Sequence, residues 1–243
     1  MKRQSSHFGS LVLIIALLAV LTVTVMMFGA HLGLWEPIVG FGYIRNYMNP
    51  IAYTVVTLGA MSFAYQLFSS NGVGIIKSFI ALLIGLGLLA PMIYEKMHPS
   101  KQYPLIHDIT TDTVNPPQFI TLNDNRPGAK NSLVYGGSKV ADQQHLAYSD
   151  IVPIYVSKSA REAFQQALNV GQSMGWEIVS QDAQKLRFEA TARTPVYQFA
   201  DDIVVVVTAL KGTTRIDIRS VSRVGLGDKG VNADRIREFI QFF

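Results

Sequence analysis

Three long apolar stretches near the N-terminus constrain the fold of this chain more than any other feature of its sequence. The first runs from residue 8 to residue 30 without a charged side chain. A helix of that length spans roughly 35 Å, enough to cross a hydrocarbon core of about 30 Å, and it exceeds the apolar region of a cleavable signal peptide. The sequence therefore predicts a retained transmembrane domain at 1–95, with spans at about 8–30, 51–68 and 75–94.

Details of the spans predict how the helices begin and pack. Pro50 precedes the second span and is expected to open it, because proline is well tolerated in the first turn of a helix. Residues 31–49 then become a connecting segment with aromatic side chains of the kind that lie at the level of the lipid headgroups. In the third span, Ala81 and Gly85 have the spacing of small residues that permits close helix contact in lipid.

Basic residues beside the spans predict the orientation. Lys2, Arg3 and Lys77 would lie on one side of the bilayer and Arg45, Lys96 and Lys101 on the other, which is nearly a tie, but Lys2 and Arg3 flank the first span. Basic flanks of the first helix usually stay in the cytoplasm, and three spans place the two ends of the chain on opposite sides of the bilayer. We therefore expect a multi-pass protein of the cell inner membrane whose soluble domain is periplasmic.

Charge and composition exclude several classes of function. Residues 95–243 hold 17 basic and 16 acidic residues, so this part lacks the net basic surface that a nucleic-acid partner requires. The chain has no cysteine, which excludes disulfides, thiolate metal sites and cysteine nucleophiles. Its five histidines show no metal-ligand spacing. We expect no metal and no cofactor.

The rest of the chain predicts one folded domain behind an irregular segment. Residues 96–150 lack periodicity and are rich in proline, so we expect turns and extended structure there. In residues 151–243, Ser159 and Glu162 form a capping box, and a two-residue hairpin turn fits at 211–212. The fold class is thus α+β: three N-terminal transmembrane helices, then a soluble antiparallel sheet domain of βαββββα order with its helices on one face. We expect its strands at 151–156, 176–179, 185–193, 203–210 and 213–224.

The last predicted strand carries a ladder of arginines. Alternation places Arg215, Asp217, Arg219 and Arg223 on one face of it. Between residues 185 and 237 there are ten basic and six acidic residues, so some guanidiniums exceed their partners and could hold a carboxylate or phosphate. The ordinary alternative is a solvated face with weak cross-strand pairs. The predicted ligand-binding residues are Asp108, Asp112, Arg187, Arg219, Arg223, Asp228, Asn232 and Arg235.

A glycine-rich stretch separates the last strand from a C-terminal amphipathic helix. Gly225, Gly227 and Gly230 could present backbone amides to an anion at the start of that helix. The stretch matches no phosphate-binding fingerprint, and the commoner interpretation is a turn with Asn232 as the helix N-cap.

Two further functions compete with anion binding. A hydrolase of a phosphate or ester substrate would bring Asp108, Asp112, Asp202 and Asp228 within metal-bridging distance. A purely structural role would instead pair Asp108 or Asp112 with arginines of the last strands, and so fasten the irregular segment to the sheet.

Four segments of the chain resemble a known family. They are HDITTDTVNPPQF, GWEI, RFEATARTPVYQFADDIVVVV and IDIRSVSRVGLGDKGVNADRI, and in this order they resemble the bacterial and plastid family called domain of unknown function 1499, over about residues 104–243. The resemblance implies an envelope protein with an anchored outside domain and no established activity. From the apolar spans and the arginine surplus, the expected partners are the lipid bilayer and an anionic envelope component or another membrane protein. The candidate positions that the resemblance implies are His107, Asp108, Thr111, Asp112, Glu189, Asp202, Arg219, Ser220, Ser222, Arg223, Gly225, Asp228, Gly230, Asn232 and Arg235.

Overall fold

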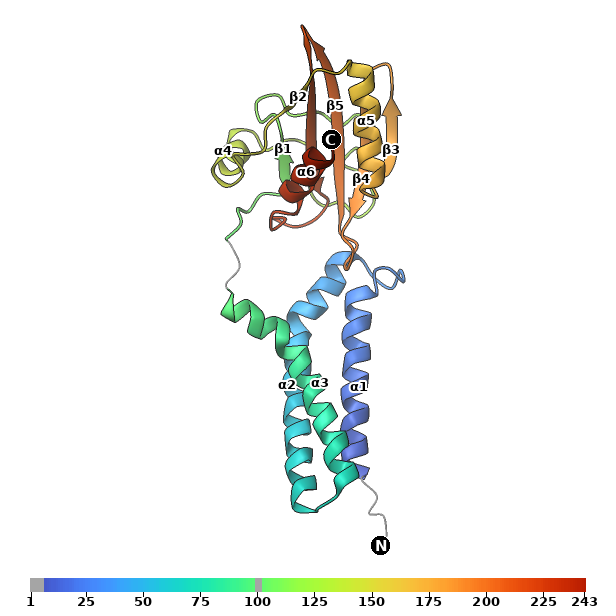
Figure 1. Ribbon diagram of the computed structural model, residues 1–243, viewed down its shortest axis with the longest axis vertical. Coiled ribbons are helices and arrows are strands. Elements are labelled where there is room, and N and C mark those ends of the chain that lie inside the picture. Colours follow the sequence, from blue (N-terminus) through green and yellow to red (C-terminus); the bar gives the residue numbers. More distant parts are fainter. Residues whose placement is uncertain (1–6, 99–101) are drawn as a thin grey trace. The chain divides into compact units, whose positions relative to one another are not determined.

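The computed structural model describes residues 7–98 and 102–243 and divides the chain into two compact units (Figure 1). The membrane unit covers residues 1–101 and the soluble unit covers residues 102–243. Lys2 and Arg3, on which the predicted orientation depends, lie outside the described residues.

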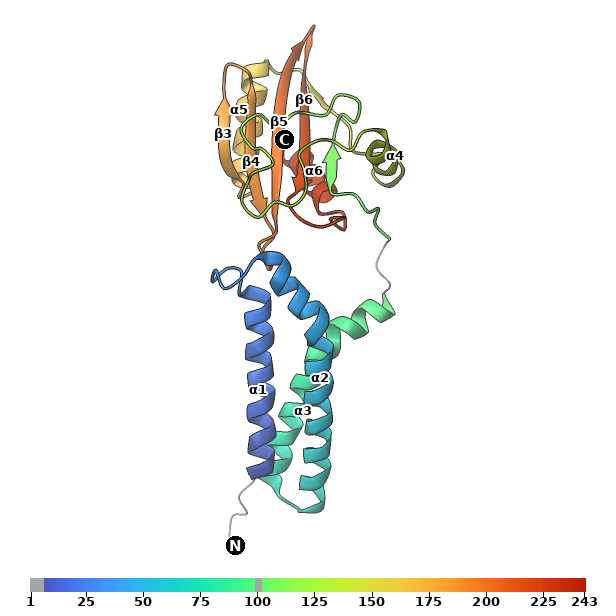
Figure 2. The ribbon, with the colours of Figure 1, turned by 180° about the vertical axis from the view of Figure 1, so that it is seen from behind.

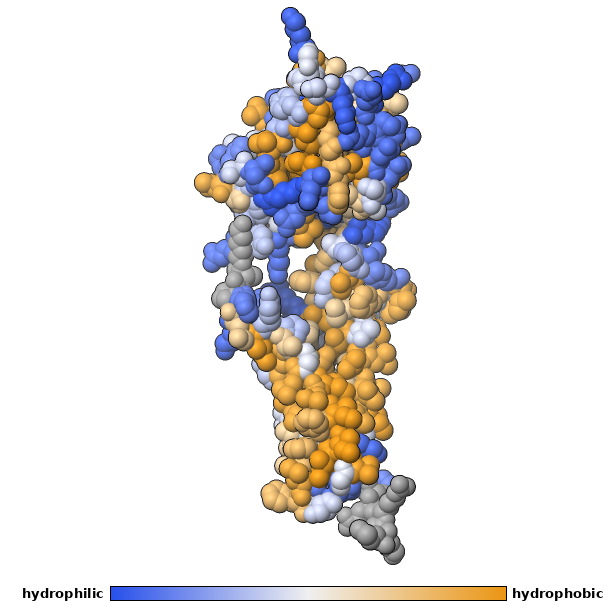
Figure 3. Space-filling model, viewed as in Figure 1, coloured by the Kyte–Doolittle hydropathy of each residue, from blue (hydrophilic) through white to orange (hydrophobic). Residues whose placement is uncertain are grey.

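Within residues 7–98, three helices are long and apolar enough to cross a membrane: α1 (His7–Phe28), α2 (Pro37–Phe68) and α3 (Gly72–Met97). Their outward surface is formed largely by apolar side chains (Figure 3). Exposure of so much apolar area is costly in water and favourable in hydrocarbon, so the three helices mark a membrane protein.

The second helix begins earlier than predicted. α2 starts at Pro37, and Pro50 lies inside the helix, so the prediction that Pro50 opens the second span is wrong. Pro37 takes the first-turn position instead, where a missing N–H costs nothing. An internal proline breaks one helical hydrogen bond, which transmembrane helices tolerate because neighbouring groups satisfy the freed carbonyl. Most of the predicted connecting segment at 31–49 is therefore helical.

Small residues let α2 and α3 approach closely, as the spacing of Ala81 and Gly85 predicts. A Cβ atom added to Gly85 would lie 2.8 Å from the backbone nitrogen of Val56, so a larger residue there would push the helices apart. Ala81 is fully buried in the same contact. Ser62 and Ser78 share a buried hydrogen bond of 2.7 Å between the same two helices, where lipid offers no alternative partner.

The described soluble unit forms one antiparallel sheet of six strands, in the order β1-β6-β5-β4-β3, with β2 also paired to β6. The predicted α+β class is confirmed. The predicted hairpin is also confirmed, since Leu210 pairs with Thr213 around a two-residue turn in which Gly212 has a φ of 79°. The strands are β1 (Asp108–Thr110), β2 (Ile154–Val156), β3 (Glu177–Asp182), β4 (Arg187–Arg193), β5 (Ala200–Leu210) and β6 (Thr213–Ser222).

Two helices, α5 (Ala160–Ser173) and α6 (Val231–Phe242), cover one face of the sheet (Figure 1). The capping box of Ser159 and Glu162 that starts α5 is present as predicted. The hydrophobic core fills the space between these helices and the sheet, with Trp176 stacked on Phe239 at 5.5 Å.

The segment at 96–150 is less irregular than predicted. It contributes β1 at the edge of β6 and helix α4 (Ser138–Ala147). Both belong to the compact soluble unit rather than to a tether. β1 has only three residues, and its pairing with β6 crosses more than a hundred positions, so local periodicity could not reveal it.

Candidate functional site

The face of the sheet opposite α5 and α6 carries the polar residues that the sequence singles out. The chain at 111–135, here called the covering segment, crosses this face (Figure 2). The strand register explains the grouping, because paired residues on adjacent strands point to the same side. One row joins Glu189, Val204 and Arg219, and the next joins Thr191, Asp202, Val221 and Asp108.

Arg219 lies at the centre of this face and is fully buried. Its Nε and Nη2 atoms donate to the two carboxylate oxygens of Asp108 at 2.9 and 2.7 Å. Its remaining hydrogen bonds go to the carbonyls of Pro117 at 3.1 Å and Leu133 at 2.7 Å, both in the covering segment. The rings of Phe119 and Tyr135 each lie 5.4 Å from the guanidinium carbon. Arg219 therefore joins β1, β6 and the covering segment by its planar fork of donors.

Asp202 is a second buried junction. Arg223 donates to its carboxylate through Nη2 at 2.7 Å and Nε at 3.0 Å, and Arg126 of the covering segment donates to the same group. Thr191 Oγ1 donates at 2.9 Å. Both arginines also donate to backbone carbonyls of the covering segment. Arg126 donates to the carbonyl of Asn131 at 3.1 Å, and Arg223 donates to the carbonyl of Pro127 at 2.9 Å. One carboxylate thus holds two cations, and all three groups are withdrawn from solvent.

Glu189 binds backbone amides of the covering segment. Its two carboxylate oxygens accept from the amides of Ile120 at 2.6 Å, Leu122 at 2.7 Å and Thr121 at 3.1 Å. Arg187 donates to the same carboxylate at 3.0 Å and also to the carbonyl of Gln118. A concave run of amides that receives an anion usually serves a ligand, but here a side chain of the same domain occupies it.

Arg215 completes this face nearer its edge. It donates to Asp112 and, through Nη2, to Asp217 Oδ1 at 3.0 Å. Asp112 also accepts from the amides of Val114 at 2.9 Å and Asn115 at 2.8 Å. Burial acts to raise the pKa of Asp112, but these amides and Arg215 together hold it below its usual value. We call the whole set the arginine layer: Asp108, Asp112, Arg126, Arg187, Glu189, Asp202, Arg215, Asp217, Arg219 and Arg223.

The surplus of basic residues between 185 and 237 is largely offset by carboxylates from upstream in the chain. Arg219 pairs with Asp108, Arg215 with Asp112, and Arg237 with Asp150, so three of the missing carboxylates come from the segment that sequence patterning left irregular. These arginines and their counter-ions are separated by 111, 103 and 87 positions in the chain.

A family model described as a protein of unknown function, DUF1499, matches residues 108–243. The chain belongs to the DUF1499 family. Among curated proteins, none matches it. The match begins at Asp108, the first residue of β1 and the partner of Arg219, so the DUF1499 domain includes the covering segment as well as the sheet.

The helix-covered face of the DUF1499 domain has its own polar cluster around Asn232. This fully buried amide accepts from Ser220 Oγ and Arg235 Nη1, both at 2.6 Å, and donates to Ser222 Oγ at 2.8 Å. Arg235 also donates to Asp201 at 2.6 Å. These contacts fasten the start of α6 to the ends of β5 and β6.

The prediction of Asn232 as the N-cap is wrong, because its side chain turns into the sheet. Gly230 is the N-cap residue, with a φ of 86°, and the carboxylate of Asp228 accepts from the amides of Gly230 at 2.9 Å and Asn232 at 2.8 Å. Desolvation by burial raises the pKa of Asp228 despite these bonds. Of the three glycines whose amides could have met an external anion, Gly230 thus already binds a carboxylate of the domain.

The four carboxylates of the hydrolytic alternative have different partners. Asp108, Asp112 and Asp202 bind arginines. Asp228 instead binds two backbone amides at the start of α6. Within residues 7–98 and 102–243, no three histidine, cysteine or acidic residues are grouped so as to hold a metal ion.

Sequence reasoning missed Arg126 and the amide-binding role of Glu189. Arg126 lies in a stretch of turn residues where no periodicity marks its side as inward. Asp202, which is among the predicted candidate positions, directly precedes an isoleucine and four valines, and a charged residue there must be paired if the strand is central.

Proposed function

We propose that this protein is a membrane-anchored, non-catalytic structural module of the cell envelope. In this proposal the helices lie in the inner membrane, and the DUF1499 domain stands on the periplasmic side as a rigid body for contact with other envelope components. The arginine layer fastens the covering segment to the sheet, which is the third of the roles that the sequence left open.

The internal pairing of the arginines carries this proposal. Arg187, Arg219, Arg223 and Arg235, the arginines predicted to contact a ligand, each bind at least one carboxylate of the domain. An external anion would have to displace such a partner, and removing one member of a buried pair costs about 3–5 kcal/mol. Anion binding by these residues stays a prediction, and so does hydrolysis, for which the positions of the carboxylates give no support.

The proposed location rests on charge and length. The apolar helices account for the membrane, and the basic residues at positions 2 and 3 favour an N-terminus in the cytoplasm. With three spans, the DUF1499 domain then lies on the other side.

Cysteine labelling tests the location, because the chain has no cysteine of its own. Leu146 is 90% exposed in the DUF1499 domain, and Phe68 is 92% exposed at the end of α2. In cells with a permeabilised outer membrane, a membrane-impermeant maleimide should label Leu146→Cys and should label Phe68→Cys only after lysis. The reverse pattern would overturn the proposed orientation.

Phosphate titration separates the structural role from anion binding. A ligand that binds the folded state raises the melting temperature as its concentration passes its Kd. We expect inorganic phosphate to shift the melting temperature of the full chain no more than sodium chloride of equal ionic strength. A saturable shift that disappears in Arg223→Gln would overturn the structural proposal in favour of an anion site.

A further inference from the structure

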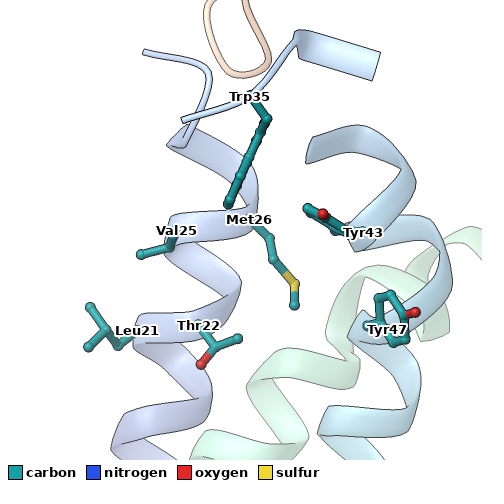
Figure 4. Close-up of a pocket in the computed structure, with 7 residues that line it drawn as sticks. All are labelled: Leu21, Thr22, Val25, Met26, Trp35, Tyr43 and Tyr47. Carbon is teal, nitrogen blue, oxygen red and sulfur yellow. The ribbon is translucent and has the colours of Figure 1, made fainter. Parts of the chain in front are cut away.

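A groove of about 520 Å³ lies between α1 and α2 in the membrane unit (Figure 4). α2 bends along its length (Figure 2), as expected for a helix with Pro50 inside it. Its first turns form one wall of the groove (Figure 4). The other wall is the C-terminal part of α1. None of the lining side chains is charged: they are Leu21, Thr22, Val25, Met26, Trp35, Tyr43 and Tyr47.

Trp35 closes one end of the groove in a fixed position. A Cβ atom on Gly29 would lie 2.3 Å from its indole ring, and one on Gly40 would lie 2.6 Å from its Nε1 atom, so two glycines make room for the ring. Tyr43 packs edge-on against the indole at 5.2 Å. The groove is therefore bounded by a rigid aromatic group rather than by a mobile side chain.

The groove opens toward the side of the helices that would face lipid. Leu21 and Tyr47 in its wall are 58% and 51% exposed, and Leu17 and Leu18, on the preceding turn of α1, are also more than half exposed. The lining is thus continuous with the surface of a predicted span. A ligand that enters the groove from this side would come from the hydrocarbon region of the bilayer.

The short length of the groove favours a flexible chain over a further helix as the occupant. Its wall on α1 covers only residues 21–26, which is roughly 8 Å of helix rise. A further spanning helix would have to pack along about 30 Å of α1 and α2, whereas a flexible apolar chain can fill a local groove of this length.

We propose that this groove is a binding site for one acyl chain of a membrane phospholipid. The chain runs along α1 beside Thr22 and Met26, and the headgroup lies toward the aromatic end of the groove, where Trp35 and Tyr43 have the amphipathic character of interfacial residues. The bound lipid fills space that would otherwise leave these side chains without packing partners.

Two threonines offer a matched test. Thr22 and Thr24 are both exposed and both donate to the carbonyl four residues earlier in α1 at 2.9 Å, but only Thr22 lines the groove. The full chain, purified in mild detergent, is analysed by native mass spectrometry as wild type, Thr22→Phe and Thr24→Phe. We expect one phospholipid adduct to survive delipidation in wild type and Thr24→Phe. In Thr22→Phe its occupancy should fall at least about fivefold, the effect of roughly 1 kcal/mol of overpacking.

Each other outcome overturns the proposal. Equal retention in all three proteins would place the lipid elsewhere on the helices. An adduct with the mass of a non-phospholipid molecule, or a dimer that dissociates in Thr22→Phe, would assign the groove to another occupant. If wild type retains no adduct, the proposal fails whether or not the variants fold.

Discussion

Removal of the carboxylate that pairs with Arg219 tests the structural role most directly. In Asp108→Asn the guanidinium stays fully buried between two rings and two carbonyls, without an opposite charge. Loss of one partner from a buried ion pair costs about 3–5 kcal/mol, a large part of a typical total stability of about 5–15 kcal/mol. At roughly 2–4 °C per kcal/mol, the melting temperature of a domain of this size should fall by roughly 6–20 °C.

The exposed pair of Arg237 and Asp150 is the matched control. It is also bidentate, with distances of 2.6 and 2.8 Å, but its side chains are 37% and 55% exposed. Water already solvates these charges, so Asp150→Asn should cost less than about 1 kcal/mol.

Urea unfolding of the full chain in detergent measures both effects. Trp176 is buried and stacked on Phe239, so its emission reports loss of the core when Trp35 is replaced by Phe in every variant. Equal destabilisation by Asp108→Asn and Asp150→Asn would refute the claim that the arginine layer fastens the covering segment. As a further check, Asp108→Leu combined with Arg219→Met should recover stability relative to Asp108→Asn, because no buried charge then remains unpaired.

Three other predictions follow from named contacts. Glu189→Gln should weaken the bonds to the amides of residues 120–122, by about 1.5–3 kcal/mol, so hydrogen exchange there should accelerate; unchanged exchange would contradict the amide-binding role. The pKa of Asp228 is higher in the folded protein than its ordinary value of about 3.8, because burial favours the protonated form. The folded state is therefore more stable below that pH, and this stability is lost as pH rises through the folded pKa. Asp228→Asn should therefore match wild type in urea unfolding at pH 3 and exceed it at pH 7, and a reversed order would contradict the burial argument. Gly85→Leu should lower the melting temperature of the membrane unit more than Gly87→Leu, because only Gly85 faces a backbone atom within 3 Å, and equal effects would contradict close packing of α2 and α3.

Local patterning was sufficient for the sheet but not for what covers it. Alternation along β6 correctly placed Arg215, Asp217, Arg219 and Arg223 on one side, because a strand permits only two directions. Alternation cannot say whether that side meets water or another segment. The covering segment has no regular structure over most of its length, so no periodic pattern in the sequence predicts its contacts with the sheet.

The predictions that Asn232 and Pro50 begin helices are wrong for a related reason. Both predictions rest on the preference of these residue types for helix starts, which is a local property. In the structure, tertiary contacts decide: the amide of Asn232 satisfies buried hydroxyls of β6, and the helix continues through Pro50. Propensity gave the correct N-cap at Ser159, where the side chain is exposed and no long-range contact competes.

The position of β1 determines how tension from the anchor would enter the DUF1499 domain. A pull transmitted along the chain from α3 first meets the bonds of Ile106 and His107 to the backbone of Asp228 and Ser222. At β1 it then meets the ladder to β6 and the bidentate contact of Asp108 with Arg219. Arg219 lies on β6 and also binds two carbonyls of the covering segment, so the load is shared between that strand and the covering segment. The N-terminal end of the domain, where force from the membrane anchor would act, is therefore also bonded to the interior of the domain. Detachment of β1 from the sheet requires several buried hydrogen bonds to break together.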